Sequence, residues 1–223
     1  MSTSPDGVAA RSRWQEVQDE LLRGITHALS NRVATLSATA YMLEFGDVTP
    51  EQAAASMRAE SERIDELLQL LRRLPAREEF ELEPVSPGEL IEDAVALHAF
   101  HCDLRDVPVQ VDAAPDVLPV LVEPHALRQA LLLALSTAKR TATRDAHGQL
   151  ATTRIVVTGD AESVIVRVHG TGVATSGVDP LAARERDAMQ HCLAGAGGAI
   201  RPLDDGGWAI QLPSLLAARR AGR

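Results

Sequence analysis

An apolar repeat with steps of three and four residues runs through the first fifth of the chain. Its members are Trp14, Val17, Leu21, Ile25, Leu29, Val33, Leu36, Ala40 and Leu43. This spacing places all of them on one face of a long α-helix. A lone amphipathic helix is marginal in water, because most helical stability comes from packing of the apolar face. The repeat therefore requires a partner for this helix.

The sequence after this repeat contains a helix stop followed at once by a helix start. Gly46 is expected to end the first helix, and "GDVTP" is typical of a tight turn. Thr49 is then a predicted N-cap, with Pro50 at the first helical position and Gln52 completing a T-x-x-Q capping box. The apolar stripe resumes over residues 57–74. Two long helices joined by so few residues form an antiparallel hairpin, which we assign to a domain of residues 8–75.

A two-helix hairpin leaves part of its apolar stripe uncovered. Pairing with a second copy of the chain into a four-helix bundle would complete the burial. The residues expected in the core of that bundle are Leu21, Ile25, Leu36, Ile64, Leu68 and Leu71. The sequence therefore predicts a homodimer that assembles through the hairpin.

The region after the hairpin changes in composition and in period. "PAREEFELEPVSP" is charged and holds three prolines, so it is expected to be a linker at a domain boundary. Beyond it we expect helices over 88–104, 125–142 and 179–197, single strands over 107–114 and 117–124, and strand hairpins over 154–170 and 198–213. Residues 84–214 should then form a second domain, an α/β sandwich with helices on one face of its sheet. The predicted fold class is α+β.

The composition of the chain limits its possible cellular location and its possible binding partners. The formal net charge of −9 argues against binding to nucleic acid or to an anionic membrane. No apolar run reaches the roughly 18 residues that a bilayer span needs, and the first residues lack the apolar middle of a signal peptide. Cys102 and Cys192 fit no metal or redox spacing. We therefore expect a cytoplasmic protein.

Aromatic residues make up only 3% of the chain, so the core should consist mainly of Leu, Val and Ala.

The order of these elements and five local motifs resemble the bacterial sensor histidine kinases. The motifs are "HALSNRVATLSATAYML" for the histidine box, "SPGELIEDAVAL" for the entry helix of the ATP-binding domain, "LVEPHALRQALLLALSTAKRTA" for the asparagine box, "VRVHGTGV" for the first glycine box and "AGAGGAIRPLDDGGWAIQLP" for the terminal hairpin. The resemblance extends from about residue 10 to residue 213. It implies a hairpin that carries a phosphorylatable histidine, followed by a domain with the ATPase fold of these kinases.

The chain departs from that family at the residues that bind the nucleotide. Leu133 and Thr137 stand where the family has two asparagines for magnesium and phosphate, and leucine offers none of the oxygen ligands that magnesium requires. Val168 replaces the aspartate that binds the adenine amino group, although Gly170 and Gly172 of this box are kept. In the family a second glycine-rich box precedes the last helix, but "DPLAARERDAMQHCL" contains no glycine. The chain therefore resembles a degenerate kinase core, and we expect no ATP binding, no other cofactor and no bound metal.

The histidine box departs from the family as well. The residue directly after His27 is Ala28 rather than an acidic residue, and Arg32 replaces a common proline. On a helical wheel His27 lies roughly opposite the apolar stripe, beside Arg23 and Asn31, so its imidazole should be exposed. A histidine that accepts phosphate from the phospho-aspartate of a receiver domain needs no nucleotide pocket. The receiver supplies the magnesium, and a neutral imidazole is already a nucleophile near pH 7.

The chain is similar in these respects to the dimeric bacterial histidine phosphotransferases, whose second domain does not bind ATP. The resemblance implies a phosphorelay protein that exchanges phosphate between His27 and receiver-domain aspartates, with Arg23 and Asn31 in contact with the receiver or the phosphoryl group. Two other functions stay open. One is a non-catalytic signalling scaffold or kinase inhibitor of the same fold, in which His27 is inert. The other is a divergent ATP-dependent histidine kinase. The expected partners are receiver domains and a second copy of the chain, with no nucleic acid and no membrane.

Other candidate sites have simpler explanations. His98, His101 and Cys102 have a helical spacing that suits zinc, but packing and hydrogen bonding explain such histidines more often. The glycine-containing stretch 169–179 lacks a following lysine or acidic partner, which favours a tight turn over a phosphate-binding loop.

Two further features of the last third of the chain point to structural roles. The mixed charges of residues 184–187 are expected on a solvated helix face. Trp208, in the last hairpin, is expected in the core.

Overall fold

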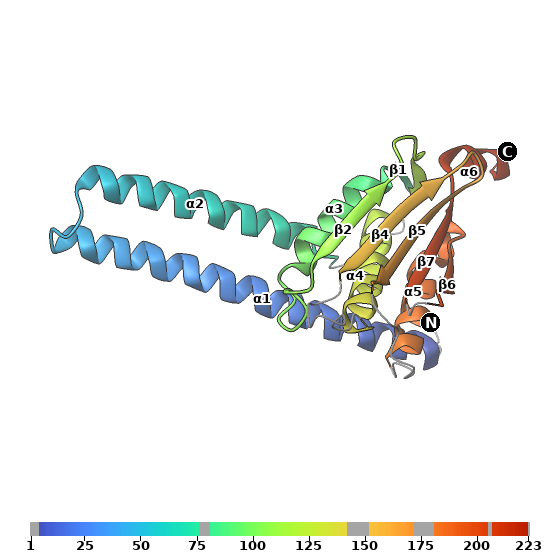
Figure 1. Ribbon diagram of the computed structural model, residues 1–223, viewed down its shortest axis with the longest axis horizontal. Helices are drawn as coiled ribbons and strands as arrows, with labels where there is room; N and C mark the ends of the chain where they lie inside the picture. Colours follow the sequence, from blue (N-terminus) through green and yellow to red (C-terminus); the bar gives the residue numbers. More distant parts are fainter. Residues whose placement is uncertain (1–4, 76–80, 142–151, 172–180, 205–206, 223) are drawn as a thin grey trace.

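The computed structural model describes residues 5–75, 81–141, 152–171, 181–204 and 207–222. Two long helices, α1 (Pro5–Glu44) and α2 (Pro50–Arg73), lie side by side and extend from a compact α/β unit (Figure 1). The predicted α+β fold, a helical hairpin followed by a helix-covered sheet, is confirmed. Among the described residues, no helix combines the length and the apolar character that crossing a membrane requires.

The turn between the two helices has the expected chemistry. Gly46 has a φ of +80°, a left-handed conformation in which a side chain would be strained. The Thr49 hydroxyl accepts a hydrogen bond from the Gln52 backbone N–H at 3.2 Å, and the Gln52 side chain accepts one from the Thr49 N–H at 2.9 Å. The predicted capping box is therefore present, and it sets the start of α2.

The strands form two sheets. The larger sheet has the order β2-β4-β5-β7-β6, and only the β2–β4 pair is parallel. Its strands are β2 (Val109–Ala113), β4 (Thr153–Gly159), β5 (Ser163–Gly170), β6 (Ala199–Pro202) and β7 (Trp208–Pro213). The smaller sheet pairs β1 (Glu83–Val85) with β3 (Val120–Val122) in antiparallel register. The predicted hairpin around Gly159 is confirmed by the β4–β5 pairing.

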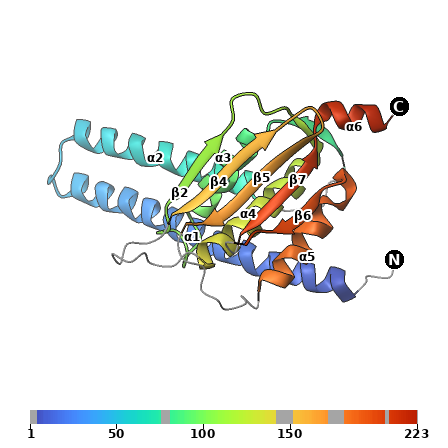
Figure 2. The ribbon, with the colours of Figure 1, turned by 45° about the vertical axis from the view of Figure 1, so that its right-hand side comes forward.

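Helices cover one face of the larger sheet (Figure 2). They are α3 (Pro87–His98), α4 (Pro124–Thr141) and α5 (Ala182–Leu193), and the short turn η1 (Ala194–Ala196) follows α5. A final helix, α6 (Leu215–Ala221), lies after the last strand. The Glu123 carboxylate accepts hydrogen bonds from the backbone N–H groups of His125 and Ala126, which satisfies two free donors at the start of α4.

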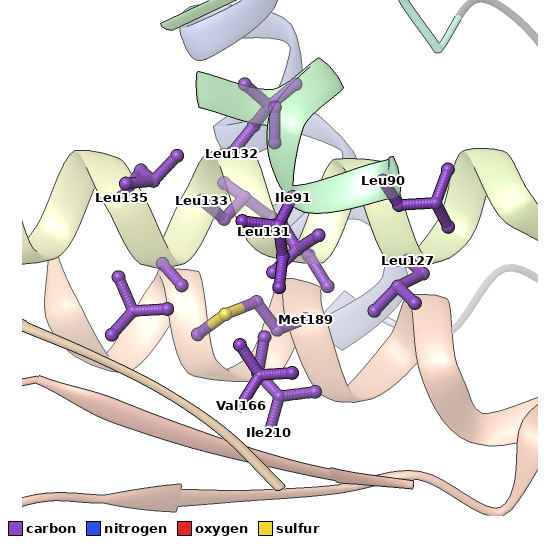
Figure 3. Packing of buried hydrophobic residues seen from close by; sticks show 14 of the residues in the cluster. Leu90, Ile91, Leu127, Leu131, Leu132, Leu133, Leu135, Val166, Met189 and Ile210 are labelled. Atoms are coloured by element: carbon purple, nitrogen blue, oxygen red, sulfur yellow. The ribbon is translucent and has the colours of Figure 1, made fainter. Parts of the chain in front are cut away.

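The core lies between the sheet and these helices and is rich in leucine, as the composition predicts. Along β4 and β5, buried residues that face the helices alternate with less buried ones. Helix α4 contributes a nearly continuous run of buried leucines (Figure 3). The run is fully buried because α3 and α5 pack against α4 on its other sides. Trp208 is in this core, as predicted.

Two local predictions are wrong, and one helix was not predicted. Part of the expected linker is strand β1, because Glu83–Val85 pairs with β3. Helix α3 ends at His98 rather than near residue 104, since the N–H groups of Phe100 and His101 turn back to carbonyls three residues earlier. Helix α6 was not expected, although Ser214 caps it by accepting a hydrogen bond from Ala217 N–H.

The apolar stripe of α1 is divided between two environments. Leu21 and Ile25 are fully buried, but they belong to the core of the α/β unit and not to a core between hairpins, so their expected place in the bundle is wrong. Further along the hairpin, Val33 is 54% exposed and Leu68 is 39% exposed. This distal part of the stripe is uncovered within one chain, as the prediction of a homodimer requires.

Candidate functional site

His27 lies on α1 where the helix leaves the α/β unit and enters the hairpin. The preceding apolar residue, Ile25, is buried on one side of the helix, whereas His27 is exposed on the other side. The helical period alone produces this arrangement, since residues two apart differ by about 200° in direction. The predicted exposure of the imidazole is confirmed.

Asn31, one turn after His27, is the described side chain that hydrogen-bonds the imidazole. Its amide nitrogen lies 3.4 Å from Nε2 of His27, which is at the long end of the range for such a bond. With the amide oriented this way, Nε2 is the acceptor and the ring proton is on Nδ1. This hydrogen bond holds the ring and occupies the lone pair of Nε2, so it has to be released before Nε2 can act as a nucleophile.

Arg23 lies one turn before His27 on the same exposed side of α1. Its guanidinium forms an ion pair with Glu20 at 3.0 Å, and its side chain is largely exposed. Positions four residues apart on a helix are close enough for their side chains to act on one ligand. Arg23 and Asn31 therefore flank the imidazole from either end, as the wheel predicts.

The structure buries all three positions at which the sequence predicts a departure from the nucleotide-binding residues of the kinases. Leu133 is 0% exposed and belongs to the hydrophobic core (Figure 3). Val168 is also 0% exposed and in this core, and Thr137 is 1% exposed. The Thr137 hydroxyl is engaged with the Leu133 carbonyl and with the Glu185 carboxylate. These side chains therefore hold the interior of the unit together.

Glu185 forms the most extensive buried polar cluster among the described residues. Its carboxylate is fully buried and accepts hydrogen bonds from Arg13 of α1, at 2.6 and 3.0 Å, and from Arg140 and Thr137 of α4. The expectation that residues 184–187 are all solvated is wrong for Glu185, although the other three are exposed. A signal was present in the sequence, because Glu185 lies one turn before the buried Met189 on the same face of α5.

Two buried histidines lie at the end of α3. The rings of His98 and His101 stack with centroids 5.1 Å apart, and Nε2 of His98 is 3.1 Å from the Ser136 hydroxyl. Burial, reinforced by the nearby positive charge of Lys139, lowers the pKa of His98 well below its usual value. Burial also lowers the pKa of His101.

The zinc site considered for this region is not supported. Cys102 is not on the helix with the two histidines, and its Sγ lies 3.6 Å from the Glu20 carbonyl, which accepts its weak hydrogen bond. Within the described ranges, no group of three or more His, Cys, Asp or Glu side chains is arranged to hold a metal ion. These histidines pack and hydrogen-bond, which is the simpler explanation.

A shallow cleft of about 430 Å³ lies between α1 and the residues that follow α3. Its lining is mixed in charge and includes Arg13, Glu20, His101, Asp103 and Arg140. Arg13 and Arg140 are both committed to Glu185, and Glu20 is paired with Arg23. Both arginines of the cleft are thus already engaged by a buried carboxylate. The turn expected over residues 169–179 lies mostly outside the described residues.

No protein-family model matches the sequence, and no curated protein matches it significantly. Among solved structures, the chain is similar to the histidine kinase AdeS of Acinetobacter baumannii, with 16% identity and a TM-score of 0.48 over 85% of this chain and 98% of that chain. It is similar to the nucleotide-free catalytic domain of histidine kinase ThkA, with 14% identity and a TM-score of 0.47 over 60% and 97% of the two chains.

It is also similar to full-length ShkA, solved in complex with AMPPNP, with 19% identity and a TM-score of 0.46. That match covers 88% of this chain but 46% of ShkA, so the chain spans less than half of that protein. At such identities the similarity concerns the arrangement of helices and strands. The function has to be argued from the chain's own side chains.

Proposed function

We propose that this protein is a histidine phosphotransfer protein of a bacterial phosphorelay, which exchanges phosphate between His27 and receiver-domain aspartates without binding ATP. The observation that carries the proposal is a contrast between two sets of residues. The imidazole of His27 is exposed and oriented by Asn31, whereas Leu133 and Val168, at positions where the kinases bind nucleotide, are fully buried.

The proposed step needs little from this chain. Once the Asn31 amide has released Nε2 of His27, the lone pair of this nitrogen attacks the phosphorus of the partner's aspartyl phosphate, and an N–P bond forms as the P–O bond to the aspartate breaks. The leaving group is the partner's carboxylate, and the Nδ1 proton of the phosphorylated ring is lost to water. Arg23 is placed to attract the phosphoryl oxygens, because guanidinium is a strong partner for phosphate. The receiver brings the magnesium ion for its own acyl phosphate.

The absence of an acidic residue beside His27 also favours this function. A histidine that attacks ATP benefits from a neighbouring base to orient the ring and take its proton, and Ala28 cannot do either. An acyl phosphate is a more reactive donor, so a neutral imidazole held by an amide is sufficient for transfer.

We also infer that the working form is a homodimer. The uncovered part of the hairpin stripe includes Val33 and Leu68, and half-buried Leu36 and Ile64 lie near them in the heptad-like pattern. Burying these side chains against a second hairpin would remove an exposed apolar surface that is costly in water. The exposed side of α1 that carries His27 would remain free.

The proposal is tested by phosphotransfer from labelled receivers. A panel of receiver domains is phosphorylated with a labelled acetyl phosphate, freed of the donor and mixed with this protein. We expect label to move to the protein within minutes as an acid-labile, alkali-stable phosphoramidate. His27→Gln should abolish labelling, and His191→Gln, which changes an exposed histidine on α5, is the matched control and should not. Asn31→Ala should slow transfer without abolishing it.

The same assay distinguishes the two other functions. Labelling of His27 by γ-labelled ATP and magnesium, without a receiver, would overturn the proposal in favour of a divergent kinase. Absence of transfer from every receiver, with the protein folded and dimeric, would favour an inert scaffold. Transfer that survives His27→Gln would place the acceptor elsewhere.

A further inference from the structure

The first turns of α1 do not belong to the hairpin, because they extend past the end of α2 and lie beside α4 and α5 (Figure 1). We call residues 12–25 of α1 the clasp. Trp14, Val17, Leu21 and Ile25 of the clasp are buried in one continuous core with the leucines of α4 and with Met189 of α5, and the partly buried Leu22 packs against it. The clasp is therefore packed as an additional helix of the α/β unit.

Gly24, within the clasp, allows a very close approach between α1 and the chain that follows α3. A Cβ atom at this position would lie 1.7 Å from the backbone carbonyl oxygen of Phe100. A backbone atom cannot move aside as the end of a side chain can. Glycine inside a helix is unfavourable relative to alanine, so its presence three residues before His27 has a packing reason. That reason is the contact with Phe100.

A buried ion pair fastens the beginning of the clasp. Arg13 is almost completely buried and reaches across to Glu185 on α5, which is also held by Arg140 and Thr137 of α4. Three elements that are distant in sequence thus share one carboxylate. Because each partner is removed from water, breaking the pair would leave a buried charge uncompensated.

The other helix of the hairpin is anchored as well. Arg73, in the last turn of α2, donates to Asp93 of α3 at 2.6 Å, and Arg128 of α4 donates to the other oxygen of the same carboxylate at 3.0 Å. Gln18 of the clasp donates to the carbonyl of Pro75, two residues after the end of α2, at 3.3 Å. Both helices of the hairpin are therefore tied to the α/β unit on different sides.

We propose that the clasp holds the α/β unit in one fixed position beneath His27, so that the unit is an immobile support for the histidine-bearing helix rather than a domain that moves. A nucleotide domain that phosphorylates a histidine must bring the phosphate to within about 3–3.5 Å of the imidazole, and this requires freedom to travel. Here an apolar core, a close-packed glycine and a buried ion pair oppose such travel. The proposal assigns a role to the α/β unit and does not depend on whether His27 is phosphorylated.

The two tryptophans of the chain allow the clasp to be followed separately from the sheet. Trp14 lies in the clasp and Trp208 in β7, and both are buried. In a Trp208→Phe background, Trp14 alone reports on the clasp through its emission wavelength and its quenching by acrylamide. In a Trp14→Phe background, Trp208 alone reports on the α/β unit. Far-UV circular dichroism reports the total helix content in both.

The deciding comparison is Gly24→Ala against Thr26→Ala, two substitutions on the same helix that both favour helix formation. Thr26 is exposed, so its replacement is the matched control. We expect Gly24→Ala to shift Trp14 emission to longer wavelength and to increase its quenching, while Trp208 and the helix content stay as in the parent. Thr26→Ala should leave both tryptophans unchanged.

A second variant covers the case in which Gly24→Ala does not fold. Glu185→Gln keeps the size of the side chain but removes the negative charge that holds Arg13, and it should expose Trp14 in the same way. The proposal is overturned if Trp14 stays as shielded in both variants as in Thr26→Ala. It is also overturned if amide hydrogen exchange in the parent protein shows the clasp residues opening as fast as the exposed end of the hairpin.

Discussion

Replacing Leu133 by asparagine introduces, at a core position of this protein, the residue that the proposed resemblance to the kinases would place there for nucleotide binding. Leu133 is 0% exposed and lies among apolar side chains of α3, α4, α5 and the sheet (Figure 3). Removing a fully buried leucine side chain forfeits about 1.5–3 kcal/mol of burial. A buried amide without partners costs a further 1–3 kcal/mol, roughly. We therefore expect Leu133→Asn to lower the free energy of unfolding by about 3–5 kcal/mol, the size of a severe core substitution.

Urea denaturation followed by circular dichroism measures this loss. Leu133→Met is the control, because a swap of similar volume in a core usually costs less than about 1.5 kcal/mol. Isothermal titration with ATP and magnesium should show no binding to wild type or to either variant. The reasoning would be refuted by a Leu133→Asn protein as stable as wild type that binds ATP with a dissociation constant below about 100 μM, some −5.5 kcal/mol.

Three further predictions concern assembly and pH. Leu68→Asp should convert a dimer into monomers in light scattering, since it places a charge in the uncovered stripe; a wild-type monomer would contradict the dimer. Burial lowers the pKa of His98, so below about pH 6.5 the unfolded chain binds more protons than the folded one. The urea concentration at the unfolding midpoint should therefore be lower at pH 5.5 than at pH 7.5, and this difference should be smaller in His98→Leu. Burial lowers the pKa of Lys139 from 10.5 to about 8. The free energy of unfolding should therefore rise as the pH increases from about 8 to 10.5, and Lys139→Met should remove that rise.

Local structure was predictable wherever neighbouring residues decide it. The three- and four-residue period placed α1 and α2, the Thr49 capping box set the start of α2, and alternation around Gly159 identified the β4–β5 hairpin. The outward direction of His27 followed from the same period, because a helix fixes the angle between residues. These signals act over a few residues, and so the sequence alone contains them.

The tertiary structure decided which surfaces meet. The spacing of Leu21 and Ile25 predicted an apolar face but could not tell a second hairpin from the α/β unit, which in fact covers them. Glu185 was placed in solvent because a charged run is usually solvated, whereas Arg13, 172 residues earlier, neutralises it in the interior. Likewise β1 and β3 pair apart from the main sheet.

Each of these outcomes depends on partners that are distant along the chain. Periodicity fixes the direction in which a side chain points relative to its own helix or strand, but burial and ion pairing are properties of the surface that it meets. The sequence by itself therefore determined the hairpin, the strand hairpins and the exposed face of His27. Only the tertiary structure decided what covers Leu133, what neutralises Glu185 and why residue 24 is a glycine, because each answer lies in contacts between elements that the chain brings together only on folding.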